Sequence, residues 1–192
     1  MAGTTGVIIL AGGKGRRMGG VDKASITVHG ERLIDRQLRQ LPYGTPTVVV
    51  SPYPLGMPQL CERPAFGGPV AGIAVGYEAL KYAPGVTHIA VLSVDAPDSP
   101  LALPDLHAAL GRAPVVVTSQ AGRVQPICAL WKKESLGHAL ERIGEPRNQP
   151  AMRLVRAAGP FAVTPSRGFD QDLDTQKDVE RFAAALGTSR RQ

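Results

Sequence analysis

The sequence predicts an α/β protein with a single domain, in which a doubly wound, mostly parallel sheet is covered by helices. Short runs rich in valine and isoleucine are apolar on both faces, as strands buried within a parallel sheet must be; they occupy residues 6–10, 47–51, 88–94 and 114–118. Segments whose apolar residues recur at helical spacing separate these runs, at 31–41, 69–83 and 103–110. Strand and helix therefore alternate, and in such folds ligands bind beyond the carboxyl ends of the strands.

The pattern changes in the second half of the chain. Residues 124–131, VQPICALW, predict a further strand, for which an antiparallel direction is considered. Two helical patterns follow, at 132–143 and 151–158. The polar, proline-bearing segment 144–151 between them is predicted to be a connector and a candidate mobile loop.

The end of the chain carries a helix signal. Thr175 precedes an amphipathic segment, and Asp178 stands three positions later, which approximates a capping box. We therefore expect one domain over residues 1–187, followed by a disordered tail at 188–192.

The composition narrows the class of protein. The 192 residues carry a formal net charge of +6, which suits nucleic acid, an acidic membrane surface or a phosphorylated ligand equally well. Aromatic residues are only 5% of the chain, so stacking platforms for nucleic acid are poorly supplied, and we expect no nucleic-acid partner. The apolar run 6–11 is too short to span a bilayer and lacks the basic flank and cleavage site of a signal peptide, so we expect a cytoplasmic location and no membrane partner. Cys61 and Cys128 stand far apart without metal-ligand spacing, so we expect free thiols.

The stretch LAGGKGRRMGGVDKA, residues 10–24, concentrates glycine and positive charge directly after the first predicted strand. Glycine lets backbone N–H groups approach an anion without a Cβ atom in the way, and basic side chains add charge. The glycines are Gly12, Gly13, Gly15, Gly19 and Gly20, and the basic residues are Lys14, Arg16, Arg17 and Lys23. A flexible surface turn is the alternative, but it leaves four neighbouring cations unexplained. The stretch therefore indicates an anion-binding loop.

Two common anion-binding loops do not fit this stretch. A Walker A loop needs Ser or Thr directly after its Gly-Lys pair, whereas Lys14 is followed by Gly15. A dinucleotide fingerprint on Gly13, Gly15 and Gly19 has a last spacing one residue too long. It also needs an acid at the end of a second strand, and the nearest acid, Asp35, lies within a helical pattern. An oxidoreductase is thus a weak alternative.

The stretch resembles the LAGGxSxRMGxDK signature of the molybdenum cofactor guanylyltransferase family. Four further segments are similar to family motifs in the same order: GGPVAGI at 67–73, VLSVDAPDSP at 91–100, QPICAL at 125–130 and DLDTQKDV at 172–179. The resemblance covers the chain from residue 6 to about residue 186. It implies the nucleotide-diphospho-sugar transferase fold and a nucleotidyltransferase activity that depends on Mg²⁺, in which an acceptor phosphate attacks the α-phosphorus of a nucleoside triphosphate.

The resemblance also implies roles for individual residues. Lys23, Arg17 and Asp95 would be catalytic. The nucleotide would be bound by Leu10, Ala11, Gly12, Gly13, Lys23, Ser51, Glu62 and Asp95. Asp95 and Asp174 would hold magnesium, and Asp172 is not separated from Asp174 as the second ligand. Turn formation before Pro97 is the alternative for Asp95, and helix capping is the alternative for Asp174.

The nucleotide and acceptor follow from the same resemblance. Gly13 makes the loop read LAGG, as in guanylyltransferases, whereas cytidylyltransferases of this fold usually read LAAG or TAAG. We therefore expect GTP and molybdenum-loaded molybdopterin as substrates, with other proteins of molybdenum cofactor biosynthesis as partners. The terminal DLDT resembles cytidylyltransferases and phospholactate guanylyltransferases, so both activities stay as alternatives. A non-catalytic accessory protein that binds nucleotide is a further alternative.

Overall fold

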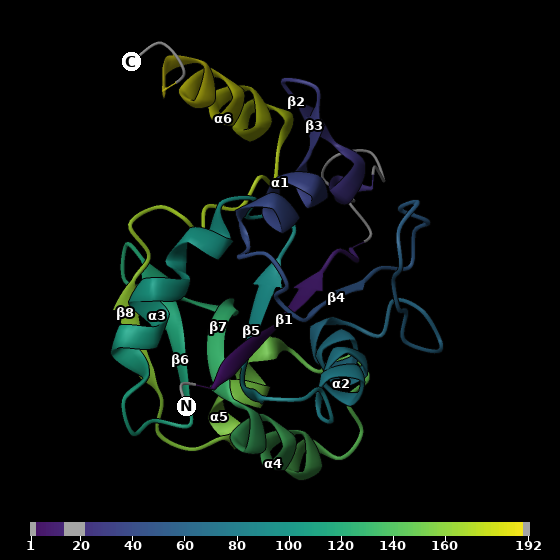
Figure 1. The fold of residues 1–192 in the computed structure, drawn as a ribbon, viewed down its shortest axis with the longest axis vertical. Helices are drawn as coiled ribbons and strands as arrows, with labels where there is room; N and C mark the ends of the chain where they lie inside the picture. Colours follow the sequence, from purple (N-terminus) through teal and green to yellow (C-terminus); the bar gives the residue numbers. More distant parts are fainter. Residues whose placement is uncertain (1–2, 14–21, 190–192) are drawn as a thin grey trace.

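Six strands form one sheet in the order β4–β1–β5–β7–β6–β8 (Figure 1). The computed structural model describes residues 3–13 and 22–189. Its sheet strands are β1 (Thr4–Leu10), β4 (Thr47–Val50), β5 (Val86–Ser93), β6 (Val115–Gln120), β7 (Arg123–Lys132) and β8 (Ala162–Pro165). β1 runs parallel to β4 and β5, and β6 runs parallel to β8. β7 is antiparallel to both of its neighbours. The mostly parallel α/β fold is therefore confirmed, and the direction considered for 124–131 is the one found.

Helices cover both faces of the sheet, as the apolar strands require. One face packs against α2 (Pro69–Leu80), α4 (Lys133–Ile143) and α5 (Ala151–Ala157), and these three helices contact one another. The other face packs against α1 (Leu33–Gln40), the short helix η3 (Ser99–Ala102) and α3 (Leu103–Leu110). Ile8 and Ile9 are neighbours in β1, both are fully buried, and they belong to the two different cores. Because helices cover both faces of the sheet, polar and apolar residues do not alternate along these strands.

Two elements differ from the sequence expectation. The segment expected to be one helix over 31–41 begins with strand β3 (Glu31–Arg32), which pairs with β2 (Thr27–Val28) as a small hairpin before α1 starts at Leu33. Gly30 turns this hairpin with a φ of +81°, a conformation that glycine adopts without strain. β8 was not predicted, because only four residues pair there and their side chains are half-buried or exposed.

The predicted capping box at the start of α6 (Gln176–Ser189) is present. The Asp178 carboxylate accepts from the backbone N–H of Thr175 at 2.9 Å, and the backbone N–H of Asp178 donates to Thr175 Oγ1 at 3.3 Å. α6 lies beyond the sheet beside α1 and the β2–β3 hairpin (Figure 1), where the Arg36 guanidinium stands 5.3 Å from the Phe182 ring centroid. The helix continues to Ser189, two residues into the segment expected to be a tail.

The connector between α4 and α5 is tied to the rest of the protein. The backbone N–H of Asn148 donates to the carbonyl of Gly67 at 2.6 Å, and the Arg147 guanidinium donates to the carbonyl of Pro64 at 2.8 Å. Both bonds reach the segment that precedes α2, so the connector borders the carboxyl-end edge of the sheet. Among the described residues, no helix is both long and apolar enough to cross a membrane.

Candidate active site

A pocket of about 370 Å³ opens at the carboxyl ends of β1, β4 and β5. Its lining combines the end of β1, the start of α2 and the turn after β5: Leu10, Gly12, Gly13, Val50, Pro52, Glu62, Phe66, Gly68, Pro69, Gly72, Ser93, Asp95 and Ile127. Because these strands are parallel, their carboxyl ends meet at one edge, which is where doubly wound folds bind ligands. The structure thus brings together five of the predicted nucleotide-site residues: Leu10, Gly12, Gly13, Glu62 and Asp95.

Two glycines that line this pocket are packed closely against neighbouring side chains. A Cβ atom on Gly12 would lie 2.8 Å from Cδ of Pro52, and one on Gly72 would lie 3.0 Å from Cδ2 of Leu10. These close approaches therefore require residues without side chains. Nothing lies within 4 Å of a Cβ built on Gly13, so that position faces open space. Gly15 and the predicted catalytic Arg17 lie outside the described residues.

Lys23 lies between two aspartates. It starts the short helix η2 (Lys23–Ser25), whose N-cap is the Asp22 side chain, which accepts from the backbone N–H of Ala24 at 3.0 Å. The Lys23 ammonium donates to Asp95 Oδ2 and to Asp174 Oδ1, both at 2.9 Å. Only 14% of the Lys23 side chain is exposed. Residues from three distant parts of the chain thus meet at one edge of the sheet, as the sequence motifs indicated.

Two hydrogen bonds fix the segment that carries Asp174. The backbone N–H of Leu173 donates to the carbonyl of Asp95 at 2.8 Å, which joins the two aspartate-bearing segments directly. Four residues upstream of Asp174, the buried Asp170 accepts from the Thr118 hydroxyl at 2.6 Å and anchors the segment to β6. Asp174 is therefore positioned by the sheet itself.

The charges of the cluster shift several pKa values. Burial alone would lower the pKa of Lys23, but the hydrogen bonds and charges of Asp174 and Asp95 outweigh it, and the pKa is raised. Burial also raises the pKa of Asp95, against the opposing charge and hydrogen bond of Lys23. The pKa values of both Lys23 and Asp95 can be raised because the single Lys23 ammonium is shared between two carboxylates, those of Asp95 and Asp174. Partial burial, followed by the charges of Asp95 and Asp174, raises the pKa of Asp172 to about 6, although part of that residue stays exposed.

The carboxylates of Asp95 and Asp174 fit a Mg²⁺ ion whose other coordination positions are filled by substrate phosphates and water. Among the described residues, no three or more His, Cys, Asp and Glu side chains form a ready cluster for a metal. Mg²⁺ usually binds through one or two carboxylates together with substrate phosphates and water, so Asp95 and Asp174 are a sufficient protein contribution. The raised pKa of Asp172 reflects, after burial, excess negative charge at this place, which a divalent cation would relieve.

Gln37 supports the turn that carries Asp95. It is fully buried in α1, and its side-chain amide donates to the carbonyls of Ser93 and Ala96, at 2.7 and 2.9 Å, and to the Ser99 hydroxyl, at 3.0 Å. Sequence reasoning missed this residue. The available signal was a glutamine on the apolar face of a predicted helix, where a polar side chain has to find buried partners.

Ser51 and Glu62 are placed differently from each other. Ser51 is 1% exposed, and its hydroxyl both donates to the carbonyl and accepts from the backbone N–H of Tyr53, at 3.1 Å each. Neither Ser51 nor Ala11, which is also buried, lines the pocket. Glu62 does line it, and its Oε1 accepts from the backbone N–H of Gly67 at 3.0 Å. The structure thus brings Glu62, but not Ser51, to a place where a ligand could meet it.

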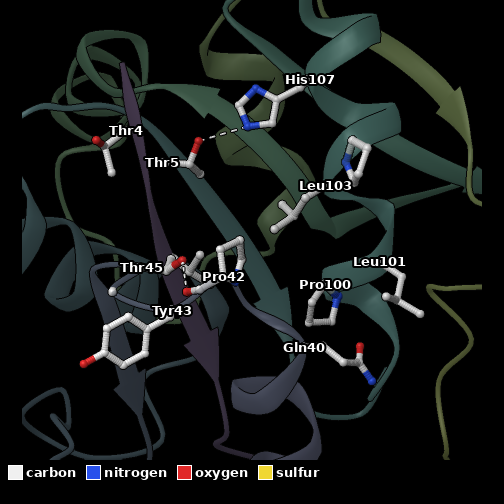
Figure 2. Close-up of a pocket in the computed structure, with 13 residues that line it drawn as sticks. Thr4, Thr5, Gln40, Pro42, Tyr43, Thr45, Pro100, Leu101, Leu103 and His107 are labelled. Carbon is white, nitrogen blue, oxygen red and sulfur yellow. Dashed lines mark hydrogen bonds between the residues drawn. The ribbon is translucent and has the colours of Figure 1, made fainter. Parts of the chain in front are cut away.

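A larger pocket, of about 570 Å³, lies at the opposite end of β1 (Figure 2). Thr5 and His107, whose Oγ1 and Nε2 atoms are 2.9 Å apart, stand on one side of it, and Tyr43 stands at another. Burial, followed by the neighbouring His88, lowers the pKa of His107, so this lining is uncharged near neutral pH. Size therefore does not identify the active site. Phosphate chemistry needs charged groups, and of these two pockets only the smaller is lined by carboxylates, one of which, Asp95, is bonded to the Lys23 ammonium.

Comparison with known proteins agrees with this geometry. Residues 7–161 match the MobA-like NTP transferase domain. The chain belongs to the MobA-like NTP transferase family. It is 37% identical over 143 residues to the molybdenum cofactor guanylyltransferase of Acidiphilium cryptum, with 70% of each chain covered. It is 34% identical to the enzyme of that name from Rhodobacter capsulatus, with 91% of this chain and 92% of the relative covered.

The fold agrees with a solved structure of similar size. The molybdopterin-guanine dinucleotide biosynthesis protein A from Archaeoglobus fulgidus superposes with a TM-score of 0.69, at 18% sequence identity, and the match covers 96% of this chain and 100% of the other. Together with the family match, this confirms a fold of the nucleotide-diphospho-sugar transferase type. The family match and the named relatives identify the chain as a nucleotidyltransferase, the class that the sequence resemblance indicated.

Proposed function

We propose that the chain is a molybdenum cofactor guanylyltransferase, which transfers GMP from GTP to molybdenum-loaded molybdopterin and releases pyrophosphate. The observation that carries this proposal is the Lys23 ammonium held between Asp95 and Asp174, at 2.9 Å from each, beside a pocket built on the glycine-rich segment. The relatives named molybdenum cofactor guanylyltransferase support the same donor and acceptor. GTP and molybdopterin are both supplied by the cytoplasm, where we place the reaction.

The reaction needs positioning and neutralisation of charge more than covalent chemistry. A phosphate oxygen of the acceptor attacks the α-phosphorus of GTP in line, a new P–O bond forms, and the bond to the pyrophosphate leaving group breaks. Lysine has three N–H donors, and two of those of Lys23 are used by the carboxylates. The third can meet the α-phosphate, where negative charge grows during the transfer. Gly12 lines the same pocket, and the backbone N–H groups of such a glycine-rich segment would donate to phosphate oxygens.

The carboxylates have a separate task in this proposal. Asp95 and Asp174 would hold Mg²⁺, which when bound neutralises phosphate oxygens and supports departure of pyrophosphate. The position of Asp95 is fixed by hydrogen bonds. Its backbone carbonyl accepts from the backbone N–H of Leu173, and the side-chain amide of Gln37 donates to the turn that contains it. Arg17 would grip the triphosphate as a planar fork of donors. Leu10 and Glu62 line the part of the pocket left for the base and ribose.

The test supplies the protein with Mg²⁺, molybdenum-loaded molybdopterin and either GTP or CTP, and measures pyrophosphate. We expect release with GTP and a nucleotide-linked pterin as the second product. Release with CTP alone would assign the chain to the cytidylyl relatives instead. No release with either nucleotide, from a protein that binds GTP, would indicate an accessory role.

A further inference from the structure

Phe66 holds an aromatic ring at the wall of the active-site pocket on an unusual backbone. It lines the pocket, 39% of its surface is exposed, and its φ is +59°. A bulky residue is uncommon in this left-handed region, where glycine or asparagine would be accommodated at lower cost. Such conformations persist where the surrounding structure enforces them, and they concentrate at ligand sites. Of the non-glycine residues with positive φ among the described residues, Phe66 is the one that lines this pocket, so its ring is a candidate contact for a ligand.

Backbone and side-chain bonds enforce the conformation from two sides. Gly67, directly after Phe66, donates its backbone N–H to Glu62 Oε1 at 3.0 Å and accepts from the backbone N–H of Asn148 at 2.6 Å. The Arg147 guanidinium donates to a carbonyl of the same segment at 2.8 Å. The turn that presents Phe66 is thus tied both to a pocket carboxylate and to the connector between α4 and α5.

Tyr53 links the ring to the glycine-rich segment. The two ring centroids are 5.9 Å apart with an interplanar angle of 69°, an edge-to-face contact that fixes the plane of Phe66. The Tyr53 hydroxyl donates to the carbonyl of Gly13 at 3.3 Å. Phe66 therefore belongs to the part of the pocket formed by Gly13 and Glu62, whereas the charged groups suited to phosphate gather around Lys23 and Asp95.

We propose that Phe66 stacks on the base of the bound nucleotide and favours purine over pyrimidine triphosphates. This inference rests on the proposed function, because it takes GTP as the donor. An aromatic ring attracts any planar base, but a bicyclic purine covers more of the ring than a pyrimidine does. Neither phosphate nor ribose offers a planar apolar face, so the base is the part of the nucleotide that this wall fits. Phe66 would act on specificity and affinity, with no part in the transfer step.

The test measures binding by calorimetry, without acceptor, for GTP, CTP and inorganic tripolyphosphate in the presence of Mg²⁺. Phe66→Ala is compared with Leu60→Ala, a control whose residue is equally exposed at 39% and does not line the pocket. We expect Phe66→Ala to weaken GTP binding by about tenfold, the typical scale of one base–aromatic stack. Binding of tripolyphosphate stays unchanged, and the preference for GTP over CTP narrows. Phe66→Tyr keeps GTP affinity, because it restores the ring.

Two results would overturn the inference. One is a GTP affinity of Phe66→Ala equal to that of Leu60→Ala. The other is an equal loss of GTP and tripolyphosphate binding, which would mark a general change in the phosphate site. Failure of guanylyl transfer is a separate outcome. If the wild-type protein does not transfer GMP but Phe66→Ala still loses GTP affinity selectively, the proposed acceptor reaction is refuted and base stacking is supported.

Discussion

Gln37 offers a quantitative test of how the active-site turn is supported. Gln37→Met keeps the length and approximate volume of the side chain and removes the two amide N–H groups that three acceptors, in Ser93, Ala96 and Ser99, share. The loss of each N–H leaves acceptors in the interior without a donor, at about 1.5 kcal/mol each, or about 3 kcal/mol together. Gln37 Oε1 is buried without a partner among the described residues, so its removal returns about 1 kcal/mol. We expect a net loss of about 2 kcal/mol, or roughly 6 °C in Tm for a domain of this size.

Urea unfolding followed by circular dichroism measures this change, with Gln176→Met as the matched control. Gln176 is exposed at the start of α6, so its replacement is expected to change stability by less than about 0.5 kcal/mol. Because Asp95 lies within the turn that Gln37 supports, nucleotidyl transfer should also fall in Gln37→Met at temperatures where the variant is fully folded. Equal stability of Gln37→Met and the wild type would refute the view that this amide network holds the turn.

Three further predictions address the cluster, the last helix and the thiols. Lys23→Met should lower the rate of pyrophosphate release by about a hundredfold, the typical cost of one lost transition-state donor; an unchanged rate would exclude Lys23 from the transfer step. Asp178→Ala breaks the capping box with Thr175 and should lower the Tm measured by circular dichroism by a few degrees; an unchanged Tm would contradict a stabilising role of the box. Burial raises the pKa of Cys128 to about 12, so iodoacetamide at neutral pH should modify Cys61 first, as mass spectrometry would show; equal labelling of the folded protein would contradict this burial.

The elements of the fold could be predicted where the pattern of apolar and polar residues is set by burial or by contacts between near neighbours in the chain. The strands of the parallel part are buried on both faces, and alternation of such apolar runs with helical patterns is typical of a sheet between two helical layers. The capping box of α6 depends on local contacts alone, and it was found where predicted. β8 and the β2–β3 hairpin were missed because short, partly exposed strands derive their pairing from distant partners, which a local pattern does not contain.

Site residues could be predicted from the sequence where a polar residue lies just beyond the end of a predicted strand. Asp95 stands two residues after the end of β5, and a carboxylate at that place has few structural uses, so the sequence pointed to it. Lys23 was indicated as a cation of the glycine-rich loop and Asp174 through a family motif, but their meeting at Asp95 is a product of the fold. Ser51 carried no local sign that its hydroxyl would be used by Tyr53. The support of the Asp95 turn by Gln37 depends on a tertiary contact across 56 residues and more.

The most direct measurement of the central claim follows a phosphorus label placed at the α position of GTP. The protein is incubated with labelled GTP, Mg²⁺ and molybdenum-loaded molybdopterin, and the products are separated. We expect the wild-type protein to transfer the label to the pterin in equal amount to the pyrophosphate released, and Asp95→Asn to lose this transfer while remaining folded. Label that stays in GTP or GMP with the wild-type protein, or transfer that Asp95→Asn performs equally well, would contradict guanylyl transfer at this site.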